Sequence, residues 1–335
     1  MRGDRGMTPG IHYGVDWDTY NADPVPGGSL RASVAATLIE ASPLHALHAD
    51  NALREATTAM DIGTAAHALI LEGDESVLVE VPADDWRTNA AKEARDEARA
   101  AGKVPLLTKD VVAVHAMVDA FWQQLPPAMA GQFRDAKKEV TVIWDDAGLM
   151  CRGRFDAYGI SEHVLLSYSE HYDDDTGGKH EIAEHGHGGI IYDLKTTAGT
   201  ARPEVWAKSR MWPGPAVQAA FYTRGAKAVT GIEHDYRLLV LEQNPPHALA
   251  IVGLDPHAMS YAQQQADVAI SVWRECRATG RYPGYDPVVH WAAPPPWAVR
   301  TWEEMKLASK AAREQGVTMT TLQAAMAAQR PLEWG

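Results

Sequence analysis

The stretch Cys151-Arg152-Gly153-Arg154-Phe155-Asp156, followed further along the chain by Asp193-Leu194-Lys195-Thr196, decides the fold and the chemistry that we expect. The apolar run Ile190-Ile191-Tyr192 leads directly into Asp193, which predicts a buried strand that ends in charged residues. Burying a carboxylate and a lysine so close together is costly unless pairing or function supports them. Two carboxylates and one ammonium group on neighbouring strands suit a divalent cation and an anionic substrate.

Composition limits the class of protein. The chain has 335 residues, of which 46% are hydrophobic, so it can bury a sizeable core. The net charge of −13 argues, taken alone, against a nucleic-acid partner, but the charge is unevenly distributed. Residues 161–188 hold seven acids and one base, whereas residues 195–237 hold seven bases and three acids, and residues 87–109 hold six bases and three acids. Local basic segments matter more for phosphate binding than the sum over the chain.

Cysteine usage and the N-terminal sequence bear on the compartment. The only two cysteines, Cys151 and Cys276, exclude a disulfide framework or a cysteine-rich zinc site. The opening Met1-Arg2-Gly3-Asp4-Arg5 lacks the apolar core of a signal peptide. No apolar run approaches the roughly 20 residues that a membrane helix needs. We therefore expect a cytoplasmic protein without a membrane partner, in the host cytoplasm if a phage encodes it.

The predicted strands lie in the middle of the chain. Residues 139–144 alternate as a strand, residues 145–148 form its turn, and residues 150–158 return as the partner strand. Residues 161–188 interrupt the pattern, and we expect a solvated acidic insert there. Its five histidines lack the spacing of a zinc site, so we prefer a solvated segment to a metal-binding tract. The next strand covers residues 189–194.

Helical periodicity dominates the flanks, and the order of elements predicts a mixed α/β (α+β) fold with a central mixed β-sheet flanked by helices. We expect an irregular segment over residues 1–30, one catalytic domain over residues 31–290, and a C-terminal loop and helical tail over residues 291–335. The predicted helices cover residues 33–40, 61–72, 90–101, 108–124, 215–229 and 256–280, with a strand pair over residues 236–242 and 248–254.

Asp156, Asp193 and Lys195 are the first candidate site. Metal-assisted phosphodiester cleavage needs carboxylates to hold Mg²⁺ and a cation to neutralise charge that develops on the phosphate. Asp-x-Lys alone is a weak motif, and without other support an ordinary strand-end salt bridge is the preferred explanation.

Four further residues each allow two interpretations. His67 is a potential metal ligand or a buried histidine bonded to a carbonyl, and Glu139 is a further metal-site acid or a residue paired with a neighbouring lysine. Gln218 and Tyr222 lie four residues apart on one helix face, where they either contact substrate or form an ordinary polar edge.

Taken in order along the chain, these residues resemble the PD-(D/E)XK nuclease superfamily, in its RecE/RecB-like phage exonuclease (exodeoxyribonuclease VIII-like) branch. The resemblance extends from about Pro9 to Pro283. It rests on Tyr20-Asn21-Ala22-Asp23, Ser33, Ser42-Pro43, Gly63-Thr64-Ala65-Ala66-His67, Thr88 to Thr108, Glu139, Gly153-Arg154-Phe155-Asp156, Asp193-Leu194-Lys195-Thr196, Gln218 and Tyr222. Phe155 stands where the family motif has proline, and Asp193 where it often has glutamate.

The resemblance implies a restriction-endonuclease-like core and a specific set of site residues. His67, Asp156, Asp193 and the carbonyl of Leu194 would hold the metal, with Glu139 as a further catalytic acid. Lys195 would orient the attacking water or stabilise charge on the phosphate. The residues expected to contact DNA are Gln218, Tyr222, Thr196 and Arg154.

The activity that follows from the resemblance is a Mg²⁺-dependent DNA exonuclease, with Mn²⁺ as a substitute, that digests linear duplex DNA in phage-type recombination. The four-cysteine cluster of the iron–sulfur branch is missing from the sequence, so we expect no iron–sulfur cluster. By family analogy the partners are DNA and a single-strand annealing protein, and a homo-oligomer is compatible with the family. Two alternatives stay open: a catalytically inactive DNA-end-binding module, and a nuclease of the same superfamily that acts on single strands or particular structures.

Overall fold

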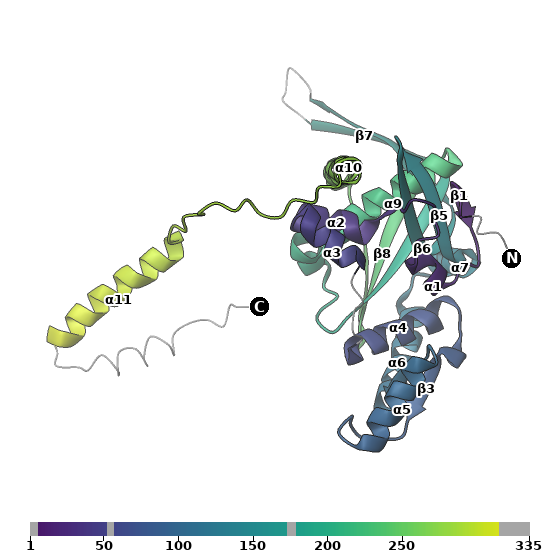
Figure 1. The fold of residues 1–335 in the computed structure, drawn as a ribbon, viewed down its shortest axis with the longest axis horizontal. Coiled ribbons are helices and arrows are strands. Elements are labelled where there is room, and N and C mark those ends of the chain that lie inside the picture. The colour runs from purple at the N-terminus through teal and green to yellow at the C-terminus, as the bar shows by residue number, and fades with distance from the viewer. Residues whose placement is uncertain (1–5, 52–56, 173–178, 315–335) are drawn as a thin grey trace. The chain divides into compact units, whose positions relative to one another are not determined.

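A seven-stranded mixed sheet forms the centre of the chain up to Tyr285 in this computed structural model (Figure 1). The structure describes residues 6–51, 57–172 and 179–314. The strand order is β1-β5-β6-β7-β8-β9, with β2 beside β6. The pairs β7–β8 and β2–β6 are parallel, and the other pairs are antiparallel. The strands are β1 (Gly10–His12), β2 (Leu30–Arg31), β5 (Lys137–Asp146), β6 (Leu149–Tyr172), β7 (Lys179–Thr197), β8 (His234–Glu242) and β9 (Leu249–Val252).

Helices cover both faces of this sheet because the side chains of its central strands alternate between two apolar cores. On β7, Ile191 belongs to one core, whereas Ile190 and Tyr192 belong to the other. The first core is closed by α2 (Ala32–Glu40), α9 (Gly214–Thr230) and α10 (Pro256–Thr279), and the second by α4 (Thr58–Leu71), α6 (Thr108–Gln124) and α7 (Pro127–Asp135). The predicted mixed α/β class with helices on both sides of a central sheet is confirmed.

Several short elements are not apparent from the sequence. The expectation that residues 1–30 are irregular is wrong in part, because this segment contains β1, which pairs with β5, and the short helix α1 (Trp17–Asn21). The two-stranded sheet of β3 (Leu78–Val81) and β4 (Val104–Leu107) also lies between α4 and α6 without a signal in the sequence. The helix between its strands, α5 (Asn89–Ala100), confirms the helix predicted over residues 90–101, and α3 (Pro43–Asn51) follows α2. Strands of two to four residues are too short to show a period of two.

The acidic insert is the main difference from the sequence-based expectation. Strands β6 and β7 continue through it as an antiparallel ladder that reaches from Ser161↔Gly188 to Tyr172↔Lys179. Figure 1 shows this hairpin extending past the helices. The expected solvated insert is therefore a β-hairpin arm in its described part, because main-chain ladder bonds can form whatever the side chains are. Residues 173–178, with three of the acids, lie outside the described part.

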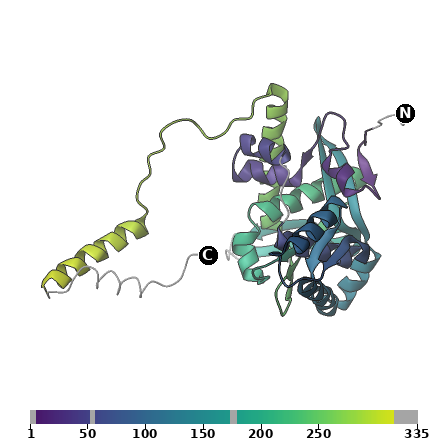
Figure 2. The ribbon, with the colours of Figure 1, turned by 60° about the horizontal axis from the view of Figure 1, so that its bottom comes forward.

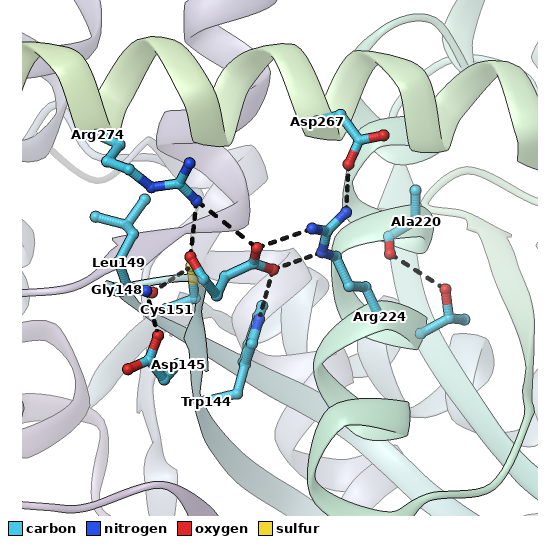
Figure 3. Close-up of polar contacts among 11 residues, drawn as sticks. Trp144, Asp145, Gly148, Leu149, Cys151, Ala220, Arg224, Asp267 and Arg274 are labelled. Carbon is cyan, nitrogen blue, oxygen red and sulfur yellow. Dashed lines mark hydrogen bonds and ion pairs between the residues drawn. The ribbon is translucent and has the colours of Figure 1, made fainter.

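A polar network around Asp146, at the end of β5, holds α9 and α10 against the sheet (Figure 3). The carboxylate is buried, and it accepts hydrogen bonds from Arg224 Nη2 at 2.8 Å and from Trp144 Nε1 at 3.3 Å. Arg224 also pairs with Asp267 of α10, and Arg274 Nη2 donates to the Asp146 carbonyl at 2.8 Å. Helix α9, which carries Gln218 and Tyr222, is thereby fixed relative to β5.

Residues from Asp286 onward form a second unit, described through residue 314. In it a proline-rich segment leads into the helix α11 (Pro296–Glu314), as Figure 2 also shows. Within the described ranges, no helix combines the length and apolar character required to cross a bilayer.

Candidate metal and catalytic centre

Strands β6 and β7 part at the position of the two predicted aspartates. Their last ladder pair on this side is Ala157↔Tyr192, whereas β7 continues beside β8 as far as Thr197↔Glu242. Beyond that last pair, the Leu194 amide donates a 2.6 Å hydrogen bond to Oδ2 of Asp156 instead of to a strand carbonyl. Where the two strands separate, the Asp156 carboxylate therefore takes the place of a main-chain hydrogen-bond acceptor.

Strand β5 is distorted at the same level. Lys138 pairs with Ala157 and Val140 with Phe155, so Glu139 lies opposite Asp156. Glu139 has φ of 54°, a left-handed conformation that is uncommon outside glycine and that often marks a functional position.

Helix α4 brings His67 to these two carboxylates. Its Nε2 lies 2.9 Å from Oδ2 of Asp156, and its Nδ1 lies 3.5 Å from Oε1 of Glu139. One ligand atom from each of His67, Glu139 and Asp156 lies within 4.8 Å of the others. Gly63 permits this approach, because a Cβ there would come within 2.7 Å of the Thr196 hydroxyl oxygen.

The carboxylates of this cluster attract positive charge to the position of His67. Burial lowers the pKa of His67, but attraction to Asp156, Glu139 and Asp193 outweighs it and raises the pKa to about 9. Burial and the neighbouring Asp156 raise the pKa of Glu139. The two carboxylates offer oxygen ligands that suit Mg²⁺ or Mn²⁺, and a neutral imidazole nitrogen is a common ligand of divalent metals. The residues present therefore fit a divalent metal.

Asp193 and Lys195 form an adjoining pair. Asp193 is 1% exposed, and Lys195 Nζ lies 2.5 Å from its Oδ2, while Gln218 Nε2 donates to its Oδ1 at 2.7 Å. Burial raises the pKa of Asp193, and Lys195 opposes that shift. Burial lowers the pKa of Lys195, but the attraction of Asp193 and Asp156 outweighs it, so the net shift is upward and favours the ammonium form. Ligation of a metal by Asp193 and by the Leu194 carbonyl stays a prediction.

Two of the residues expected to contact DNA, Arg154 and Tyr222, make contacts inside the protein. Arg154 is 11% exposed, pairs with Glu139 and donates to the Val15 carbonyl at 2.5 Å. The Tyr222 ring is buried, with its centroid 4.9 Å from that of Phe155. Contact of Arg154, Tyr222, Gln218 and Thr196 with DNA stays a prediction.

Gln243 is a site residue that the sequence analysis misses. Its side-chain amide donates to the Ala59 carbonyl of α4 at 3.0 Å and to Thr196 Oγ1 at 3.1 Å. It therefore ties α4 to β7 beside Gly63. Its position in the sequence could have identified it. Gln243 directly follows β8, and β8 ends at the same level as β7, to which it is parallel.

The comparisons with known proteins bear on the fold. No protein-family model matches the chain, and no curated protein matches it. A crystal structure from Eubacterium rectale, named "Putative exonuclease", is similar with a TM-score of 0.53 and 11% sequence identity, over 87% of this chain and 99% of that chain. At this identity the similarity shows a shared fold: a mixed α/β architecture around a central mixed sheet flanked by helices.

Proposed function

We propose that this protein is a Mg²⁺-dependent DNA exonuclease of the PD-(D/E)XK type, which hydrolyses phosphodiester bonds of linear duplex DNA. One observation carries the proposal. His67, Glu139 and Asp156 meet where β6 and β7 part, with the Asp193–Lys195 pair beside them. The likeness to the fold of the structure named an exonuclease supports it.

The chemistry assigns a role to each side chain. His67, Glu139 and Asp156 would hold the metal, which would polarise the phosphate and lower the pKa of water. The Lys195 ammonium would orient the attacking water and neutralise charge on the phosphate. The water oxygen adds to phosphorus and releases a proton to solvent, the bond to the leaving oxygen breaks, and that oxygen takes up a proton. Gln218 would hold Asp193 in place for Lys195.

The biological setting follows from the family resemblance alone. We propose a role in phage-type recombination in the host cytoplasm, with DNA as substrate and a single-strand annealing protein as partner. A homo-oligomer is compatible with this role, and Mn²⁺ should replace Mg²⁺.

Linear duplex DNA, end-labelled at either the 5′ or the 3′ end, tests the proposal. Wild-type protein should shorten it with Mg²⁺ but not with EDTA, and should leave covalently closed circles intact. Asp193→Asn protein should be inactive. Equal digestion by the two proteins, or digestion that persists in EDTA, would exclude the assigned site. Binding to DNA ends without release of nucleotides would favour the inactive end-binding module instead.

A further inference from the structure

A basic connection, residues 198–213, joins the two elements that supply Lys195 and Gln218. It leaves β7 directly after the Asp-x-Lys motif and enters α9 one turn before Gln218. It contains three cations and one acid, in a chain whose net charge is −13. These residues are Arg202, Lys208, Arg210 and Glu204.

This connection is anchored rather than loose. The Ala201 amide donates to Glu242 Oε1 at 2.7 Å, and the buried Trp206 indole donates to the Thr200 carbonyl at 2.9 Å. The Met211 amide donates to the Trp206 carbonyl five residues earlier, at 2.9 Å, which defines the π-helical turn η2 (Trp206–Arg210). Such turns are rare and frequently accompany functional sites.

The anchored turn presents its cations to solvent. Lys208 and Arg210 are exposed, and neither has an ion-pair partner within residues 6–51, 57–172 and 179–314. Arg202 pairs with Glu204 at 3.3 Å, and both side chains are about two-thirds exposed or more, so this pair contributes little. Within the described residues, Lys208 and Arg210 thus place two unpaired positive charges just before the start of α9.

We propose that Lys208 and Arg210 bind backbone phosphates of the DNA strand that leads into the active centre. This inference rests on the proposed function and extends it with a substrate-binding surface. Lysine and arginine on a fixed turn can pair with consecutive phosphates without reading the base sequence. Each phosphate that they neutralise releases counterions, so their contribution should appear in the salt dependence of binding.

The test compares Lys208→Gln/Arg210→Gln with Lys227→Gln. Lys227 is also exposed. It lies thirteen residues after Gly214, the first residue of α9, and is therefore about 20 Å along the helix from its start. Fluorescence anisotropy with labelled duplex DNA in EDTA, over a range of salt, measures affinity without cleavage. Each neutralised phosphate contributes roughly 0.9 to the magnitude of the slope of log affinity against log salt. Because the double variant loses two such contacts, the magnitude of its slope should be smaller by about 2. In Mg²⁺ its KM for DNA should rise at least about tenfold while kcat stays the same.

A double variant that keeps the wild-type salt slope and KM would overturn the inference, as would an equal effect of Lys227→Gln. Unchanged urea midpoints would show that the variants fold. The two proposals fail separately. A wild-type protein that binds DNA with the expected slope but never cleaves it would reject the nuclease function and retain the binding surface.

Discussion

Nε2 of His67 lies 2.9 Å from Oδ2 of Asp156, the same oxygen that accepts the Leu194 amide. One carboxylate oxygen therefore joins helix α4 to strand β7 across the point where the sheet opens. Burial raises the pKa of Asp156, but His67, Lys195 and this amide outweigh it and hold the pKa below its usual value. Asp156 is thus kept ionised in the position from which it would bind a cation.

Asp156→Asn should abolish nuclease activity while the protein still folds. The asparagine oxygen can accept the Leu194 amide, but the negative charge beside His67 is lost. Since a metal contributes several kcal/mol to catalysis, activity should fall by at least about 100-fold. Calorimetric titration with Mn²⁺ should show weaker binding, and a nuclease assay measures the loss.

Asp255→Asn is the matched control for that change. Asp255 also accepts a backbone amide, from Ala258 at 2.8 Å, but at the start of α10. Asparagine caps helices as well as aspartate does, so activity should remain within about twofold of wild type. Normal metal affinity in Asp156→Asn would contradict the assignment of Asp156 as a ligand.

Lys195→Met should lower both activity and stability. It leaves Asp193, which is 1% exposed, without its cation. Loss of a partner from a fully buried pair costs about 3–5 kcal/mol, and the partial exposure of Lys195 reduces the expected loss to about 1–3 kcal/mol. Urea denaturation measures it, with the exposed Lys137→Met as a control expected within about 0.5 kcal/mol. A Lys195→Met protein as stable as this control would show that the ion pair contributes nothing.

The larger part of the fold could be predicted from periodicity, as α4, α6, α9 and α10 illustrate. Each has an apolar stripe of at least three turns, and each lies within a few residues of its expected bounds. The hairpin arm could not be predicted in this way. Its strands are specified by ladder pairing with each other rather than by burial, so residues such as Glu184 and His185 carry no alternating apolar signal.

The candidate site also contains residues that could be predicted from the sequence and one whose position could not. His67 and Asp156 could be identified because a motif in the right order singles them out. The position of Glu139 within the same cluster depends on a left-handed residue in β5 and on the early end of the β6–β7 ladder. Both features arise from tertiary packing, which local propensity does not encode.

Acid should destabilise the protein through His234. This side chain is buried beside Tyr158, whose hydroxyl lies 3.2 Å from its Nε2, and burial lowers the pKa of His234 to about 4. The unfolded chain, with a histidine pKa near 6.5, binds the proton more readily, so stability falls as pH drops from about 6.5 to about 4. The loss should be on the order of 2–3 kcal/mol, measured by urea denaturation across that range. His234→Gln should flatten this dependence, and an unchanged profile would assign it to other groups.

Gly63→Ala should destabilise the protein although alanine favours helices. The added Cβ would lie 2.7 Å from Thr196 Oγ1, so α4 must move away from β7 and take His67 with it. We expect a loss of about 1–3 kcal/mol, typical of overpacking, together with reduced metal affinity. Thermal unfolding and Mn²⁺ titration measure the two effects.

Gly131→Ala is the control that shows the effect of alanine on helix stability without a steric clash. Gly131 lies in α7 with nothing within 4 Å of the position of its Cβ, so alanine should stabilise the protein by roughly 0.5–1 kcal/mol. Thr196→Ala removes the obstructing hydroxyl and should restore most of the stability lost in Gly63→Ala, because the two changes share one contact. If Gly63→Ala instead stabilised the protein as Gly131→Ala does, the close approach of α4 to β7 would not be what positions His67.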